Sequence, residues 1–249
     1  MRPDLSRRAV AELVGTAVLV LAVIGSGIAA SRLTSDGGLQ LLVNAAATAG
    51  ALIAIILAVG PVSGAHLNPV VTLADRVLGG LTTAEAGVYV GAQVVGGAVG
   101  AAVANVMFGL PAVELSTHAR SSGALWTSEV VATFGLLLVI FGVVRSGRSA
   151  VAPFAVAAYI GGAYFFTSST SFANPAVTLA RTLSDTFAGI EPASVPAFVV
   201  AQILGAGLAI ALVRLLYPDI AEVASAVVLP HPVTDSDADP ARRREHTSS

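Results

Sequence analysis

The sequence has 249 residues, of which 55% are apolar and only 11% are charged. A soluble domain carries about 25% charged residues, so this chain cannot cover a water-exposed surface and its main solvent must be lipid. Its net charge of −2 gives no indication of a basic face for nucleic acid, and we expect no nucleic-acid partner. The absence of cysteine excludes disulfides, thiolate metal sites and cysteine nucleophiles.

Six long apolar stretches dominate the chain. A helix that crosses the hydrocarbon core needs about 20 mostly apolar residues, and each stretch is close to or above that length. The sequence therefore predicts an all-α membrane protein with six transmembrane helices. In chain order, the predicted spans are 9–31, 39–60, 84–108, 125–145, 149–167 and 193–216.

The basic residues predict the orientation of these spans. All 13 are arginine; ten fall on the side of the two termini and three on the other, so the positive-inside rule places both termini in the cytoplasm. We expect a cytoplasmic N-terminus over 1–8, a membrane domain over 9–216 and a disordered, proline-rich cytoplasmic tail over 217–249. The bias toward Ala, Val, Gly and Arg suggests a bacterial chain and hence the inner (plasma) membrane.

Two segments between the spans, 61–80 and 168–184, are too apolar for ordinary loops and too short to cross the bilayer alone. Each begins with small and polar residues, continues with Asn-Pro and then allows one or two helical turns. Non-helical backbone at membrane depth is tolerated only where it is buried in protein or lines a cavity. We therefore predict two re-entrant half-helices.

The two halves of the chain resemble each other at three places, in the same order. The pairs are AELVGTAVL (11–19) with SEVVATFGL (128–136), NPVVTLADR (68–76) with NPAVTLAR (174–181), and VGAQVVGGAV (90–99) with VVAQILGAGL (199–208). Chance recurrence of small apolar words explains one such match but not three. Each repeat, about 9–108 and 125–216, holds three spans and one half-helix. The second copy is therefore inverted, and a shared site is expected at the bilayer midplane.

The Asn-Pro pairs predict how the half-helices begin. Asparagine is a strong N-cap and proline is favoured at the first helical position, so capping alone explains Asn68-Pro69 and Asn174-Pro175 in water. At membrane depth, however, each amide must be satisfied or wetted. Two half-helices that meet head to head would offer two amide donors and two positive dipole ends, an arrangement that suits a pore for uncharged molecules.

These features together resemble the aquaporin, or major intrinsic protein, family. The resemblance is carried by the boxes Asn68-Pro69-Val70 and Asn174-Pro175-Ala176, by SGAHLNP before the first box, and by the paired AExxGT and AQxxG words. It implies an hourglass fold of six transmembrane helices and two half-helices arranged as an inverted repeat, in a homotetramer with one pore in each protomer.

Four polar residues inside the spans form two pairs across the repeat: Glu12 with Glu129, and Gln93 with Gln202. Carboxylates inside a membrane are costly and mark either a functional relay or a structural acceptor. A proton relay is the alternative, but the repeat symmetry and the family resemblance favour acceptors that support the re-entrant backbone. Glycines within 91–100 and 205–207 are expected to permit close helix packing.

The resemblance also points to a selectivity filter. Most members carry an arginine after the second box, where this chain has Val177, and counting from the two asparagines gives Thr48, Gly162 and Ser171 as the other filter positions. This set is small and uncharged, so it predicts a wide opening with weakened exclusion of cations. Arg181 lies one helical turn later, and we expect its charge at the far end of the half-helix, where it does not replace the missing arginine.

The function predicted from these observations is a passive channel for small uncharged solutes: water, glycerol-like polyols, and arsenite or other neutral metalloid hydroxides. With Val177 in place of arginine, the filter set resembles that of the aquaglyceroporin-like channels associated with bacterial arsenic resistance. The alternatives are a water-selective aquaporin and a gradient-driven secondary transporter, which also uses inverted repeats. We expect no enzyme activity, metal or cofactor, because the residues form no catalytic or metal-ligand set.

Overall fold

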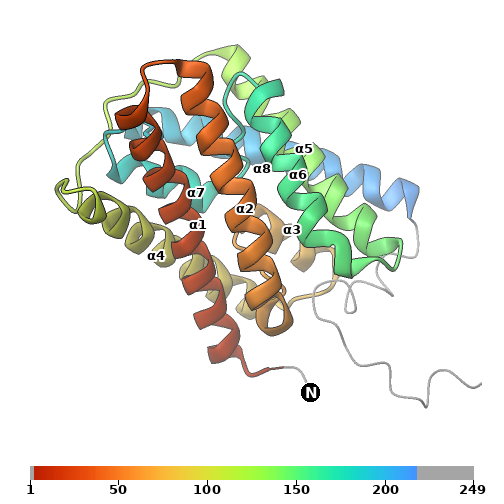
Figure 1. Cartoon of the computed structure of the whole chain (residues 1–249). Helices are drawn as coiled ribbons and strands as arrows, with labels where there is room; N and C mark the ends of the chain where they lie inside the picture. The colour runs from red at the N-terminus through yellow and green to blue at the C-terminus, as the bar shows by residue number, and fades with distance from the viewer. Residues whose placement is uncertain (1–2, 218–249) are drawn as a thin grey trace, which may run out of the picture.

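The computed structural model describes residues 3–217, which form eight α-helices and three short 3-10 turns and contain no strand. The predicted tail lies almost wholly outside these residues. The all-α membrane fold is confirmed (Figure 1). The helices are α1 (Leu5–Leu33), α2 (Gly37–Ser63), α3 (Pro69–Leu78), α4 (Thr83–Met107), α5 (Gly123–Arg145), α6 (Ala152–Phe166), α7 (Pro175–Ala180) and α8 (Val195–Leu216).

Six of the helices, α1, α2, α4, α5, α6 and α8, are long and apolar enough to cross a membrane. Together with the short 3-10 turns before α6 and α8, they make spans of 18 to 29 residues, so the chain is a multi-pass membrane protein. Some boundaries differ from the apolar runs because polar caps decide where a helix begins. For example, α1 begins at Leu5, since the Asp4 carboxylate accepts a hydrogen bond from the backbone N–H of Arg7.

The inverted repeat is visible in the helix packing. In the first half α1 packs against α4 and α2, and in the second half α5 packs in the same way against α8 and α6 (Figure 1). Glycines make the closest of these contacts possible. A Cβ on Gly96 of α4 would overlap the carbonyl of Leu13 in α1, and one on Gly205 of α8 would overlap the carbonyl of Val130 in α5.

The two re-entrant segments lie between these helix pairs and join the two halves. Each half-helix, α3 and α7, begins directly after a box asparagine that serves as its N-cap. α3 packs against α4 and also against α8, while α7 packs against α8 and also against α4. Each half-helix therefore contacts the last span of both repeats, and the two boxes meet inside the molecule.

A long loop covers the end of the molecule beyond α7. Its segment around Ser116 pairs with the backbone after the second half-helix, through Ser116 N–H to Thr182 O (2.9 Å) and Glu191 N–H to His118 O (2.8 Å). Asp185 accepts hydrogen bonds from Thr117, and these hold the pKa of its carboxyl below the usual range. The bond from the backbone N–H of Thr117 has the largest effect. This loop fixes the backbone on which the second re-entrant segment ends.

Candidate functional site

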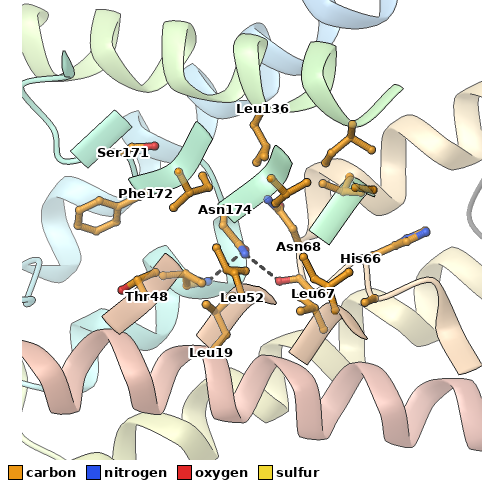
Figure 2. Close-up of a pocket in the computed structure, with 18 of the residues that line it drawn as sticks. Leu19, Thr48, Leu52, His66, Leu67, Asn68, Leu136, Ser171, Phe172 and Asn174 are labelled. Carbon is orange, nitrogen blue, oxygen red and sulfur yellow. Dashed lines mark hydrogen bonds between the residues drawn. The ribbon is translucent and has the colours of Figure 1, made fainter. Parts of the chain in front are cut away.

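A cavity of about 130 Å³ runs through the interior between the two repeats. Apolar side chains make up most of its lining, and α1, α2, α5 and α6 contribute most of them. Both box asparagines line its middle, His66 lies toward one end, and Ser171 and Phe172 lie toward the other (Figure 2). We call these the His66 end and the Ser171 end. A solute that follows this cavity meets both re-entrant segments in turn.

Each box asparagine uses its carboxamide oxygen to cap its own half-helix. Asn68 Oδ1 accepts from the backbone N–H of Val70 at 3.0 Å. Asn174 Oδ1 accepts from the N–H groups of Ala176 and Val177 at 3.0 and 3.2 Å. The caps fix both side chains against the half-helices, so their amide nitrogens can point only toward the opposite segment and the cavity.

The amide nitrogens tie the two boxes to each other. Asn68 Nδ2 donates to the carbonyl of Ala173, and Asn174 Nδ2 donates to the carbonyl of Leu67, both at 2.8 Å. Figure 2 shows the bond from Asn174 to Leu67 in the middle of the cavity. A carboxamide nitrogen carries two hydrogens, and each here uses one for this bond. Each asparagine therefore retains one donor for a solute.

The chain before each box adopts a conformation that few side chains tolerate. The positive φ angles are 49° at Ala65, 53° at Leu67, 52° at Ser171 and 47° at Ala173. Such left-handed residues cost about 1–3 kcal/mol each and persist only when their surroundings hold them. Since these residues lie directly before the box asparagines, neighbouring groups must hold them in this conformation.

In the first repeat Glu12 provides this support. Its carboxylate accepts hydrogen bonds from Ser63 Oγ (2.6 Å), the backbone N–H groups of His66 (2.9 Å) and Leu67 (2.7 Å), and Gln93 Nε2 (2.8 Å). Glu12 is fully buried, and all four donors come from the re-entrant segment and its neighbouring helices. The geometry is that of a structural acceptor.

In the second repeat Glu129 repeats the arrangement donor by donor. It accepts from Ser169 Oγ (2.6 Å), the N–H groups of Phe172 and Ala173 (both 2.9 Å), and Gln202 Nε2 (2.7 Å). Two carboxylates with the same four kinds of donor at equivalent positions serve the backbone of both repeats. A relay would instead need contact with the cavity, and neither glutamate lines it.

The structure brings three of the four expected filter residues together and separates the fourth. Thr48, Ser171 and Val177 all line the cavity. Gly162 of α6 is exposed and is not among the residues that line the cavity, so it stands apart from the other three. Tyr164, on the same helix, does line the cavity, and its Oη lies 3.1 Å from Thr48 Oγ1. Two residues along a helix turn the side chain by about 200°, which separates these two positions.

Arg181 lies in the cavity wall, contrary to the expectation that its charge is remote. It lines the same cavity as Val177, and its guanidinium carbon lies 3.4 Å from the centre of the Phe172 ring. Its Nε donates to the carbonyl of Ala188. The side chain is therefore held across the Ser171 end of the cavity, and the filter is neither wholly small nor uncharged.

At the opposite end, His66 joins a buried polar cluster. Its Nδ1 lies 3.0 Å from Thr72 Oγ1, its Nε2 lies 3.8 Å from Asp75 Oδ2, and its ring packs edge-on against Tyr89. His66 also lines the cavity. The two ends thus differ in charge: the His66 end is backed by a carboxylate and the Ser171 end by a guanidinium.

Sequence reasoning missed Tyr164 and Phe172 and misplaced Arg181. Helical phase offered a signal for Tyr164, because Ile160 lies one turn earlier and also lines the cavity. Phe172 lies in irregular backbone, where no periodicity predicts the direction of a side chain. The length of the arginine side chain decides the position of its charge, and sequence spacing does not contain that information.

Comparison with known proteins places this architecture in a family. The sequence profile of the family described as Major intrinsic protein matches residues 1–171 and 149–238. Aquaglyceroporin AqpS of Rhizobium meliloti (strain 1021) is 50% identical over 213 residues, which cover 86% of this chain and 91% of that protein. Probable aquaporin TIP1-2 of Oryza sativa subsp. japonica is 32% identical over 169 residues, which cover 64% of this chain and 67% of that protein.

The fold has a solved counterpart. The X-ray structure of the aquaglyceroporin from Plasmodium falciparum superimposes with a TM-score of 0.66 at 19% identity, covering 87% of this chain and 99% of that one. At this identity the match bears on the fold alone. The family match spans both repeats, and the relative at 50% identity aligns over most of its length. The chain therefore belongs to the major intrinsic protein family.

Proposed function

We propose that this protein is a passive channel that carries small polyols of the glycerol type, together with water, through one pore in each protomer. The observation that carries the proposal is the cavity that passes both box asparagines and reaches Ser171 and Val177 without an arginine at position 177. The name of the relative at 50% identity, an aquaglyceroporin, supports the same solute class.

The Ser171 end of the cavity is lined by both hydroxyl groups and apolar side chains, a combination that suits a polyol. Thr48, Tyr164 and Ser171 offer hydroxyl groups, and Ser171 Oγ is buried without a hydrogen-bond partner among residues 3–217. Phe172 and Val177 offer apolar surface. A polyol can place its carbon chain on the apolar side while its hydroxyls bond to the polar side, as in other binding sites with few polar groups.

The proposal includes an orientation and an assembly. Arginine placement supports an orientation with both termini in the cytoplasm of a bacterial cell, and in this orientation the Ser171 end opens outward across the plasma membrane. The family resemblance implies a homotetramer. The mass of the detergent-solubilised protein checks this, and four times the chain mass of 24.9 kDa is the expected result.

Neutral metalloid hydroxides are the second solute class in the proposal. At neutral pH arsenous acid is uncharged and carries several hydroxyl groups. It therefore resembles a small polyol in its size and in its hydrogen-bonding groups. Because a pore sets no direction, such a solute would flow down its concentration gradient. Arsenite uptake into vesicles tests this extension separately from glycerol.

Stopped-flow light scattering on proteoliposomes tests the proposed function directly. The wild-type protein is reconstituted and challenged with glycerol, urea and the larger polyol sorbitol, with protein-free vesicles as the control. We expect glycerol to enter at least about tenfold faster than in the control, and sorbitol at the control rate. Water flux without glycerol flux would favour a water-selective pore, and uptake that requires a proton or sodium gradient would favour a secondary transporter.

A further inference from the structure

We propose that Arg181 is the specificity-determining cation of this pore: it supplies, from one helical turn beyond Val177, the fixed positive charge that keeps cations out of the Ser171 end. The proposal rests on the channel function proposed above. It differs from the expectation of a filter without charge, and it assigns the role to a residue outside the two boxes.

The burial of Arg181 is the first argument. Its side chain is only 3% exposed, and within residues 3–217 no carboxylate lies within ion-pair distance of it. A buried charge without an opposite charge is strongly unfavourable in a protein interior, and ionisable groups at membrane depth mark solute and ion pathways. Structural packing alone does not account for a guanidinium in this place.

The contacts that hold Arg181 leave its tip available. Nε donates to the carbonyl of Ala188, and the guanidinium plane stacks on Phe172, well inside the roughly 6 Å range of a cation–π contact. Within the described part of the chain, neither Nη1 nor Nη2 makes a hydrogen bond. The N–H groups of these two nitrogens can therefore donate hydrogen bonds to a solute in the cavity.

The position of the charge is the third argument. Arg181 lines the same cavity as Ser171 and Val177, so a cation must pass a full positive charge to enter. Arg120 stacks on the same Phe172 ring at 5.2 Å but does not line the cavity. It adds a second positive charge behind the first. A fixed positive charge in a narrow low-dielectric pore is an electrostatic barrier to cations. An uncharged polyol meets no such barrier and can accept hydrogen bonds from the same guanidinium.

Ion and glycerol flux measured on the same proteoliposomes test the inference. Arg181→Met removes the charge and keeps an unbranched apolar stem. We expect its sodium flux to rise at least about tenfold over wild type while glycerol still enters clearly faster than in protein-free vesicles. Arg181→Lys keeps a charge and is expected to retain most of the exclusion. The double variant Val177→Arg with Arg181→Met returns an arginine to the wall and is expected to lower sodium flux again.

Arg32 provides a matched control. It also stacks on a phenylalanine, Phe108, at 5.2 Å and donates to a backbone carbonyl, but it is exposed and outside the cavity. Arg32→Met is therefore expected to leave sodium flux at the wild-type value. An equal rise in both variants, or no rise in Arg181→Met while its glycerol flux persists, would overturn the inference. A wild type without any glycerol flux would overturn the proposed function instead.

A thiol measurement decides the case in which Arg181→Met does not fold. The chain has no cysteine, so Arg181→Cys carries a single thiol in an otherwise native background. A small membrane-impermeant methanethiosulfonate should label this thiol in intact vesicles through the pore, and a positively charged reagent should lower sodium flux. Failure of the thiol to react in vesicles, while it reacts in denaturant, would place position 181 outside the pathway and reject the inference.

Discussion

Single carboxylates hold the irregular backbone that gives this pore its polar groups. Glu12 and Glu129 each accept four hydrogen bonds in a fully buried position, two of them from backbone N–H groups beside residues with positive φ. An acceptor lost at such a site leaves several buried donors unsatisfied, and each costs about 1–3 kcal/mol. The strain before the boxes is therefore balanced locally, within each repeat.

Glu129→Ala tests this balance. We expect the variant to lose about 3 kcal/mol or more of folding stability, because four donors lose their acceptor, and to unfold at a clearly lower temperature in detergent. Glu129→Gln keeps one acceptor oxygen, so its folding stability should lie between those of Glu129→Ala and wild type. Glu114→Ala, at an exposed loop position, is the control and should match wild type. Equal thermal stability of Glu129→Ala and wild type would contradict the structural role.

At the residue scale, the sequence predicts those residues whose role depends only on their neighbours in the chain. The boxes could be read because an asparagine followed by proline is a helix start in any environment. Gly162 was assigned by counting across residues 167–174, which are not helical, and that count carries no information on rotation about α6. Arg181 was misjudged because its side chain is long enough to place a charge far from its own Cα.

At the element scale, helices approach closely where glycines expose the backbone. Gly96 and Gly100 of α4 face the carbonyls of Leu13 and Ala17 in α1, one turn apart. Without a hydrophobic driving force between helices in lipid, such close packing is a main source of association. The spans themselves were predicted to within a few residues because bilayer thickness sets their length, while caps that lie outside the apolar runs moved the ends.

Gly96→Ala tests the helix contact. A methyl group there meets the backbone of α1, which cannot move away as a flexible side chain can, so we expect a loss of about 1–3 kcal/mol. Gly91→Ala on the same helix adds its methyl group in open space and should be neutral or slightly stabilising. Thermal unfolding of both variants in the same detergent provides the comparison. Equal losses would show that the contact does not limit stability.

At the scale of the whole molecule, the inverted repeat explains why two short segments build one site. Each half-helix packs on the last span of both repeats, and the amide of each box donates to the segment of the other. The repeat could be found in the sequence, since three matched words keep their order. The charge difference between the ends could not, because Asp75 and Arg181 act through side-chain directions that the matched words do not contain.

We propose that the pore admits glycerol because position 177 carries valine and no arginine. The most direct test is stopped-flow measurement of glycerol and water flux for wild type and Val177→Arg in the same proteoliposomes. We predict that wild type passes both, and that the variant loses at least about tenfold in glycerol flux while it keeps water flux. Equal glycerol flux in the two proteins, or a wild type that passes only water, would contradict the account.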